Sequence, residues 1–366
     1  MKLFRGWECL GVWVCSRIFL RPFCPFRNLL IIGSIHSVLK SHIYYDIPLT
    51  MDERDKTEAA VRVFFKWQHE RRITKERERR QLLSRCVIAG GSMHSLALRP
   101  DGSVACWGGN LCSQAPPEGI PGDFVAVAGG ISHALALRRD GSVKCWGRIE
   151  NGLNGDIIPD DIPGDFVAIA AGHGHSLALR RDGGIACSGQ NPYGEAPPDG
   201  VEGDFVAVAG GDNHSLALRR DGSVACWGNN EYHQAPPDGM DGDFVAIAAG
   251  SNHSLALGRD GSVACWGDDT YLQTPLDVIY GDFVAIAGGG GHSLALRRDG
   301  SVRCWGCNEY GQAPPAGVDG DFVAIAAGGF HSLALRRDGR VTCWGNNEYD
   351  QAPTEGVVGQ FFAHND

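Results

Sequence analysis

The sequence predicts an all-β protein, a seven-bladed β-propeller made of seven repeats of about 39 residues and preceded by one N-terminal helix. The first observation behind this prediction is a histidine that recurs at steps of 39, 42, 39, 39, 39 and 39 residues. The second is that every repeat carries two strand-like runs on either side of an Asp-Gly pair. The recurring histidines are His94, His133, His175, His214, His253, His292 and His331.

Three runs in each repeat have the patterns of strands. In the repeat that begins at residue 203, FVAVA at 205–209 is a short apolar run typical of a strand covered on both faces. HSLALR at 214–219 alternates, so its two leucines point to one face and its Ser and Ala to the other. We therefore expect the leucines of one blade to nest against the small side chains of its neighbour. SVACWG at 223–228 supplies the third strand.

Tight turns and loops connect these strands. Asp221-Gly222 separates the second and third strands, and Asp-Gly is the pair that best tolerates positive φ at both central positions of a type I′ turn. The sequence thus predicts a type I′ hairpin in every repeat. The loop after the third strand contains paired Pro and Gly, which cannot continue a ladder, and part of it is a candidate for a fourth, outer strand.

The chain divides into three segments. Residues 86–366 hold the repeats and form the predicted propeller. Residues 51–85 lack Gly and Pro, are rich in Glu, Lys, Arg and Gln, and predict one charged helix, either packed beside the ring or acting as a calmodulin-type or membrane-surface helix. Residues 1–50 fit neither a membrane span nor a secretory signal, so we expect an unstructured or spurious N-terminal extension.

Charge is unevenly distributed along the chain. The whole sequence has a formal net charge of −10, but residues 86–366 hold 16 Lys and Arg against 34 Asp and Glu, a net charge of −18. An acidic surface repels phosphate, so nucleic acid is excluded as a ligand of the propeller. The charge favours a protein partner with a basic surface.

The motif AGGxHSLALRRDGSVxCWGxNxxGQ resembles the repeat of the regulator of chromosome condensation family, in the short-repeat form that also resembles propeller-type inhibitors of β-lactamase. The resemblance covers about residues 86–366 and implies a seven-bladed β-propeller. It does not select one function, because this architecture serves as exchange factor, ubiquitin-ligase recognition domain, enzyme inhibitor and scaffold.

We predict a protein–protein interaction scaffold that has no catalytic activity of its own. The alternatives are an exchange factor or regulator for a small GTPase, the substrate-recognition part of a HECT-type ubiquitin ligase system, and a proteinaceous enzyme inhibitor. The repeats are nearly uniform in length, whereas the resemblance implies an inserted wedge in a GTPase exchange factor. Only 23 residues follow residue 343, which leaves no room for a ligase catalytic domain.

The recurring His and Cys residues suggest structural roles. The seven histidines are equivalent by pseudo-symmetry, whereas a catalytic centre needs different groups that converge, so we expect hydrogen bonding and no catalytic, metal or cofactor site. One cysteine per repeat precedes Trp, or Ser188 in one case, at positions too far apart for disulfides. Reduced thiols favour the cytoplasm or nucleus. The lone CxxC of Cys304 and Cys307 and the GGGGH run at 288–292 are weak signals for a redox or nucleotide site.

The candidate binding residues lie in the loops between blades. Tyrosine is typical of binding hot spots, but each Tyr could also simply pack on the neighbouring blade. The second repeat carries a three-residue insertion with extra acidic residues, which favours a basic partner there. The protein-binding candidates are Tyr193, Tyr232, Tyr271, Tyr310, Tyr349, Gln234, Gln312, Asp156, Asp160 and Asp161, with Gln273 and Gln351 at equivalent positions.

The two ends of the repeat array predict how the ring closes. The first repeat reads LLSRCVIAGG where others read GDFVAVAGG, and the C-terminal GVVGQFFAHND copies the opening of a further repeat. We therefore predict that residues 359–364 pair with the first blade near residues 95–108. A closed ring of this kind is expected to be a monomer.

Overall fold

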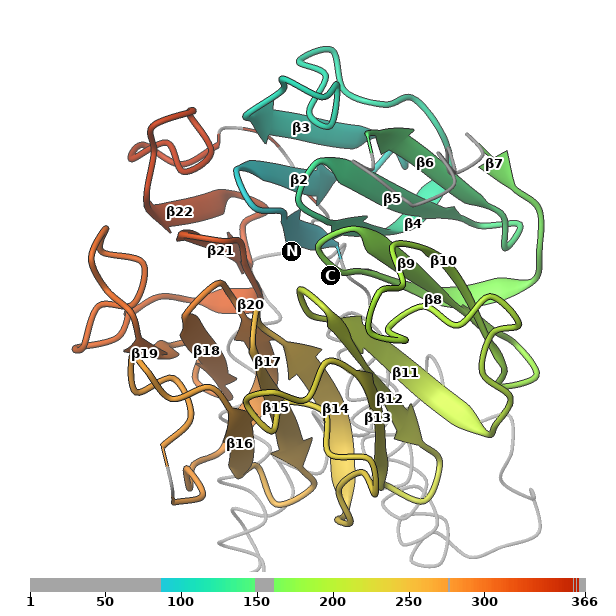
Figure 1. The fold of residues 1–366 in the computed structure, drawn as a ribbon. Helices are drawn as coiled ribbons and strands as arrows, with labels where there is room; N and C mark the ends of the chain where they lie inside the picture. The colour runs from blue at the N-terminus through green and yellow to red at the C-terminus, as the bar shows by residue number, and fades with distance from the viewer. Residues whose placement is uncertain (1–86, 149–160, 276, 358, 360, 362–366) are drawn as a thin grey trace, which may run out of the picture. The chain divides into compact units, whose positions relative to one another are not determined.

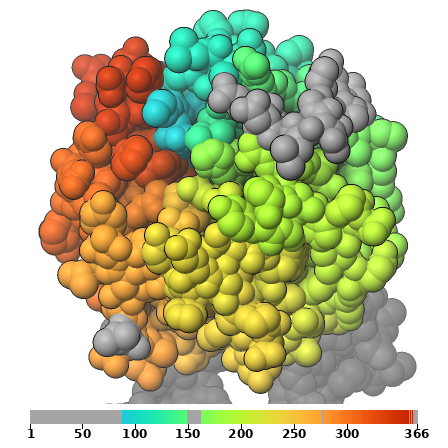
Figure 2. Space-filling model, in the orientation of Figure 1, coloured from blue at the N-terminus to red at the C-terminus, as the bar shows by residue number. Residues whose placement is uncertain are grey.

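A computed structural model describes residues 87–148, 161–275, 277–357, 359 and 361. These residues form seven antiparallel sheets, one for each repeat, which we call blades 1 to 7 in chain order. The blades follow one another around a ring, so that the red last blade lies beside the blue-green first blade (Figures 1 and 2). The seven-bladed β-propeller predicted from the sequence is confirmed. The predictions for residues 1–50 and for a helix at 51–85 fall outside the described residues.

The first strand of each blade lies innermost, because successive first strands contact one another and the last of them contacts the first again. The inner strands are β1 (Ile88–Gly90), β4 (Phe124–Gly129), β8 (Phe166–Ala171), β11 (Phe205–Gly210), β14 (Phe244–Ala249), β17 (Phe283–Gly288) and β20 (Phe322–Ala327). The middle strands are β2 (His94–Leu98), β5 (His133–Arg138), β9 (His175–Arg180), β12 (His214–Arg219), β15 (His253–Gly258), β18 (His292–Arg297) and β21 (His331–Arg336).

The third strand of each blade pairs with the middle strand and lies outside it. These outer strands are β3 (Val104–Gly108), β6 (Val143–Gly147), β10 (Ile185–Gly189), β13 (Val224–Gly228), β16 (Val263–Gly267), β19 (Val302–Gly306) and β22 (Val341–Gly345). The candidate fourth strand is much reduced. It forms the two-residue β7 (Asp161–Ile162) in blade 2 and a single bridge such as Val224 to Met240 in each of the other six blades.

The hairpin between the middle and outer strands differs from the predicted type I′ turn. In blade 4 the Arg219 N–H donates to the Ser223 carbonyl at 2.8 Å, and the Gly222 N–H donates to the Arg219 carbonyl at 3.0 Å. Gly222 has φ +93°, but Asp221 does not have positive φ. The prediction was wrong because only the glycine adopts the left-handed conformation, which is the three-residue hairpin loop with a glycine bulge. Asp221 instead accepts hydrogen bonds from Ser223.

The core lies between the blades, as the alternation of the middle strands predicts. On β12 the side chains from His214 to Leu218 are buried, and Arg219 at the end of the strand is exposed. Leu216 and Leu218 belong to one apolar cluster with Ala256 of the next blade. The same pattern of leucines against the next blade's alanine recurs around the ring, so each blade completes its neighbour's core.

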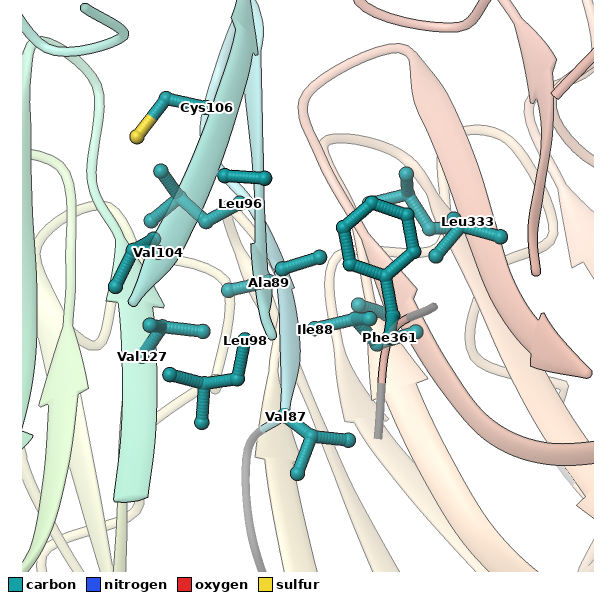
Figure 3. Close-up of a cluster of buried hydrophobic side chains, with 14 of the residues drawn as sticks. Val87, Ile88, Ala89, Leu96, Leu98, Val104, Cys106, Val127, Leu333 and Phe361 are labelled. Carbon is teal, nitrogen blue, oxygen red and sulfur yellow. The ribbon is translucent and has the colours of Figure 1, made fainter. Parts of the chain in front are cut away.

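Phe361 supplies a core side chain that the first blade lacks. Its N–H donates to the Gly339 carbonyl of blade 7 at 2.9 Å, just as the Phe124 N–H at the start of β4 donates to Gly102 of blade 1. Its side chain is buried in a cluster with Ile88 and Leu333 (Figure 3). The C-terminal segment therefore reaches the first blade through packing, with the ring centroids of Phe361 and Trp107 6.4 Å apart, while its described backbone hydrogen bond belongs to blade 7.

Candidate protein-binding face

Each blade has two ends with different chemistry. The Asp-Gly hairpin turns lie at one end, which we call the turn face. At the other end the middle strand begins and the outer strand finishes, as the pairing of His214 with Gly228 in blade 4 shows. The loops that carry the candidate tyrosines leave the outer strands at this second end, which we call the tyrosine face.

A repeated hydrogen-bond network joins the blades just beneath the tyrosine face. His214 Nε2 lies 3.0 Å from Ser254 Oγ of the next blade, and Ser254 Oγ donates to the carbonyl of Gln234 at 2.9 Å. Because the serine proton goes to that carbonyl, the histidine donates from Nε2–H, which leaves Nδ1 without a proton. Equivalent His–Ser bonds occur for His133, His175, His253, His292 and His331. Hydrogen bonds of this kind are what the structural role predicted for the repeat histidines requires, and that role stays a prediction.

Burial keeps these histidines neutral. Removal from water lowers the pKa of each buried imidazole from 6.5 to about 3 or 4, the desolvation being the largest cause in every case. His94 is the exception in the network, since the next blade has Ala134 where the others have Ser. Neither ring nitrogen of His94 has a hydrogen-bond partner within the described residues, although the side chain is fully buried.

Tryptophan adds a second bond between neighbouring blades. Trp266 Nε1–H donates to the Gln234 carbonyl at 3.0 Å, so that one backbone oxygen of blade 4 accepts from both Ser254 and Trp266 of blade 5. The same bond is made by Trp107, Trp146, Trp227, Trp305 and Trp344. The residue at the Gln234 position is therefore the joint between a tyrosine loop and the following blade.

The glutamines at this joint orient the tyrosines from within. Gln234 is 1% exposed and Gln312 is 0% exposed, and the Oε1 atom of each accepts the N–H of the tyrosine two residues earlier, at 2.9 Å in both loops. Their side chains are thus enclosed by their own loops. Burial removes Gln234 and Gln312 from the set of side chains that a partner could touch, and it makes them positioning residues of the face.

The five tyrosines are exposed on this face. Their side chains range from 40% exposed for Tyr349 to 55% for Tyr193. Tyr310 also packs edge-to-face on Phe330 of blade 7, with ring centroids 5.6 Å apart. For Tyr310 the two readings, packing on the next blade and presentation to solvent, therefore hold together, because its ring packs on Phe330 while the side chain stays 50% exposed.

The predicted acidic sector of blade 2 is only partly described. Asp156 and Asp160 lie outside the described residues, and Asp161 is the first residue of β7, where it pairs with Lys144 in the strand register. A different acidic group is visible at the inner edge of blades 3 and 4. Asp212 Oδ1 lies 3.9 Å from His173 Nδ1, and this nearby carboxylate raises the pKa of the histidine above 6.5.

Sequence reasoning missed four apolar side chains of the tyrosine face. Met93, Leu111, Leu272 and Phe330 are exposed, and Leu111 is 95% exposed. They were missed because they occupy positions that vary between repeats, so no period singles them out. Their positions within the repeat could have identified them. Leu111 and Leu272 each lie one residue from the tyrosine position. Met93 and Phe330 each directly precede the recurring histidine.

The cysteines form no disulfide and no obvious reactive centre in the described part of the chain. None of the nine described cysteines is in a disulfide. Burial raises the pKa of Cys106, Cys226, Cys265, Cys304 and Cys343 to about 12. A thiol with a raised pKa is a poor nucleophile at neutral pH. Among the same described residues, no three His, Cys, Asp or Glu side chains are grouped as metal ligands would be.

The described residues thus form a β-propeller of similar repeats, in which His–Ser and Trp–carbonyl hydrogen bonds join neighbouring blades. A sequence profile described as "Regulator of chromosome condensation (RCC1) repeat" matches the chain seven times, once for each blade. The chain therefore belongs to the regulator of chromosome condensation (RCC1) repeat family. The matched residues are 87–114, 124–152, 166–195, 205–234, 244–273, 283–312 and 322–351. None of the curated proteins compared with the chain matches it.

Several solved structures share the fold. Prp20p of Saccharomyces cerevisiae, whose structure is described together with its binding to Gsp1p and histones, is 21% identical over 62% of this chain and 72% of its own, with a TM-score of 0.52. The ectodomain of the Arabidopsis thaliana receptor kinase ACR4 is 24% identical over 73% of this chain and 98% of its own, with a TM-score of 0.57. Human WBSCR16 is 22% identical over 71% and 86%, with a TM-score of 0.57.

None of the described segments is a helix of the length and apolar character that a membrane span needs.

Proposed function

We propose that the protein is a protein-binding scaffold without catalytic activity and that it contacts its partner through the tyrosine face. The observation that carries this proposal is the set of five tyrosines, one on each of blades 3 to 7, exposed at the same end of the ring. Aromatic side chains bury large area with few rotatable bonds, which makes them effective in interfaces. Prp20p, a protein of the same fold, is described with its binding to Gsp1p and histones.

The loops are built to present these side chains without further ordering. In each of the five tyrosine loops, the backbone N–H of the tyrosine donates a hydrogen bond to the side chain of the residue two positions later, at 2.7 to 2.9 Å. The following blade then holds the backbone of that same residue. A surface that is ordered before binding loses little conformational entropy when a partner docks.

The charge of the chain and its cysteines indicate the kind of partner and the compartment that we propose. The net charge of −18 over residues 86–366 favours a partner with a basic surface. The nine described cysteines form no disulfide, which favours a reducing compartment, the cytoplasm or the nucleus.

The test is affinity capture with the full chain and with two variants. One variant replaces Tyr232, Tyr271 and Tyr310 by Ala. The matched control replaces Tyr280 by Ala, because Tyr280 is 80% exposed but lies at the turn face, between the bridge residue Ile279 and the start of β17. We expect captured proteins to be lost from the triple variant and kept by the control, with equal thermal stability of all three. Capture that survives in the triple variant would contradict the proposal.

A further inference from the structure

The tyrosine face is not uniform, and its apolar side chains gather on blades 5, 6, 7 and 1. Tyr271, Tyr310 and Tyr349 are joined there by exposed residues that only these blades have. They are Leu272 at 72% exposed, Phe330 at 43%, Met93 at 41% and Leu111 at 95%. We call these seven residues the aromatic row. A monomeric protein seldom exposes so many large apolar side chains along one edge unless they form an interface.

The row is continuous across blade boundaries. Tyr310 of blade 6 packs on Phe330 of blade 7 with the rings at 65° to one another. Tyr271 of blade 5 lies against Gly291 of blade 6, where even a methyl group would meet its ring at 3.1 Å. Since the same loop geometry places each tyrosine beside the residue that precedes the next blade's histidine, the row extends from blade 5 around to blade 1.

The loops that carry the row contain a backbone position in the left-handed conformation, which is unfavourable for residues other than glycine. The residue after each tyrosine position has positive φ, and Leu272 has φ +62°. A bulky side chain rarely adopts this left-handed conformation, and it costs on the order of 1 kcal/mol or more. Such residues persist where the surrounding structure determines them, and they collect at binding sites. An exposed leucine held in this way indicates a surface shaped for contact.

The charges beside the row have one sign. The four loops at 108–114, 267–273, 306–312 and 345–351 contain five Asp and Glu residues and no Lys or Arg. Two of the five, Asp268 and Asp269, accept hydrogen bonds within their own loop. The side chains of Glu309, Glu348 and Asp350 are exposed and make no hydrogen bond or ion pair to any described residue.

The turn face differs from the row because it carries cations of its own. There the arginine after the middle strand binds the aspartate before the inner strand, as Arg259 does Asp243 at 2.9 Å and Arg181 does Asp165 at 2.8 Å. The cations of the described propeller thus lie mainly at the end opposite the row. The free carboxylates of the row are complementary to cations that the four loops of the row do not themselves supply.

We propose that the aromatic row binds an extended protein segment rich in arginine, and this inference rests on the scaffold function proposed above. A guanidinium group stacks on a tyrosine ring and donates hydrogen bonds to a carboxylate in the same plane, so one arginine suits the tyrosine and the carboxylate that the loops of blades 5, 6 and 7 carry together. The apolar stems of the same side chains cover Leu272, Phe330 and Met93. Lysine fits less well, because its ammonium group is more strongly hydrated and cannot stack.

The test measures binding of a labelled, unstructured peptide of alternating Arg and Ser to the full chain by fluorescence anisotropy. Peptides with Lys or Glu in place of Arg are the comparison. We expect the Arg peptide to bind most tightly, the Lys peptide less tightly and the Glu peptide not at all, with binding weakened by salt. Replacing Tyr271 and Tyr310 by Ala, which leaves every charge in place, is expected to weaken Arg-peptide binding by about tenfold or more. Tyr280→Ala is expected to bind as the wild type does.

Two results would overturn the inference. One is Arg-peptide binding that is unchanged in the Tyr271→Ala, Tyr310→Ala variant, which would mean that net charge alone attracts the peptide. The other is equal binding of the Arg and Glu peptides. Either result, together with captured proteins that still depend on Tyr232, Tyr271 and Tyr310, would reject the arginine-rich partner and leave the scaffold proposal standing. Capture that ignores these tyrosines would reject the scaffold proposal itself.

Discussion

Ser95 Oγ in the first blade lies 2.8 Å from His331 Nε2 in the seventh, although the two residues are 236 positions apart in sequence. Ser95 also donates to the carbonyl of Gln351 at 3.0 Å, and Trp107 donates to the same oxygen at 3.1 Å. At the inner edge the Gly329 N–H donates to the Gly91 carbonyl at 3.2 Å. The last blade is thus joined to the first by the same His–Ser and Trp–carbonyl bonds that join blades 3 to 7 in succession.

Ser95→Ala is expected to destabilise the propeller by about 1 to 3 kcal/mol, because it leaves the buried Nε2–H of His331 without an acceptor. Urea unfolding followed by tryptophan fluorescence measures the change. Ser103→Ala is the control, since Ser103 lies in an exposed turn. An equal effect of the two substitutions would contradict the structural role of the buried bond.

Ala134→Ser is expected to stabilise the protein by about 0.5 to 1.5 kcal/mol, because it restores the partner that His94 lacks. The control is Ala136→Ser on the same strand, which buries a hydroxyl in the apolar cluster between blades 1 and 2 and is expected to destabilise. The midpoint of urea unfolding distinguishes the two. If Ala134→Ser lowers that midpoint as Ala136→Ser does, the missing bond is not what distinguishes His94.

Periodicity explains how much could be predicted from the sequence. The strands around Leu216 and the turn at Gly222 follow from alternation and from Asp-Gly, because both are local patterns. The burial of Gln234 could not be predicted, because it depends on bonds to its own loop and to the next blade. Leu272 was overlooked for the opposite reason, since it differs from the residues at its repeat position.

Phe361→Ala is expected to lower stability by about 3 to 5 kcal/mol, the usual effect of emptying a buried aromatic site. Deleting residues 357–366 removes the same side chain and is expected to lower the melting temperature at least as much. The matched control is Phe330→Ala, because Phe330 is exposed. Melting curves that coincide for the wild type and the deletion would show that the C-terminal segment does not close the ring.

Glu195→Gln is expected to raise stability near pH 7 by about 1 kcal/mol. Glu195 replaces the glutamine of the other loops, its side chain is fully buried, and its Oε1 has no hydrogen-bond partner within the described residues. Desolvation raises the pKa of this carboxyl above 4.5, so folding is penalised where the unfolded carboxyl would ionise and the penalty disappears as the pH falls. The gain from Glu195→Gln is therefore expected to shrink at lower pH, and unfolding curves at two pH values measure it.

Stability is expected to fall steeply as the pH falls from about 6.5 toward 4. The pKa of each repeat histidine is lowered by burial from 6.5 to about 3 or 4 in the folded chain, whereas the unfolded chain takes up a proton at each near 6.5. In this window the unfolded state binds more protons, so acid favours unfolding. The turn aspartates such as Asp221 have a pKa lowered from 3.8, so they act only below this window.

His331→Gln tests this origin of the pH dependence. The variant keeps an N–H donor but removes one titrating group, so each pH unit between 6 and 5 should cost it less stability than the wild type, by about 1.4 kcal/mol or less. It is expected to be less stable than the wild type at pH 7, because Gln does not fill the imidazole site. Free energies of unfolding at several pH values provide the measurement. A pH slope that is the same in the variant and the wild type would assign the acid sensitivity to other groups.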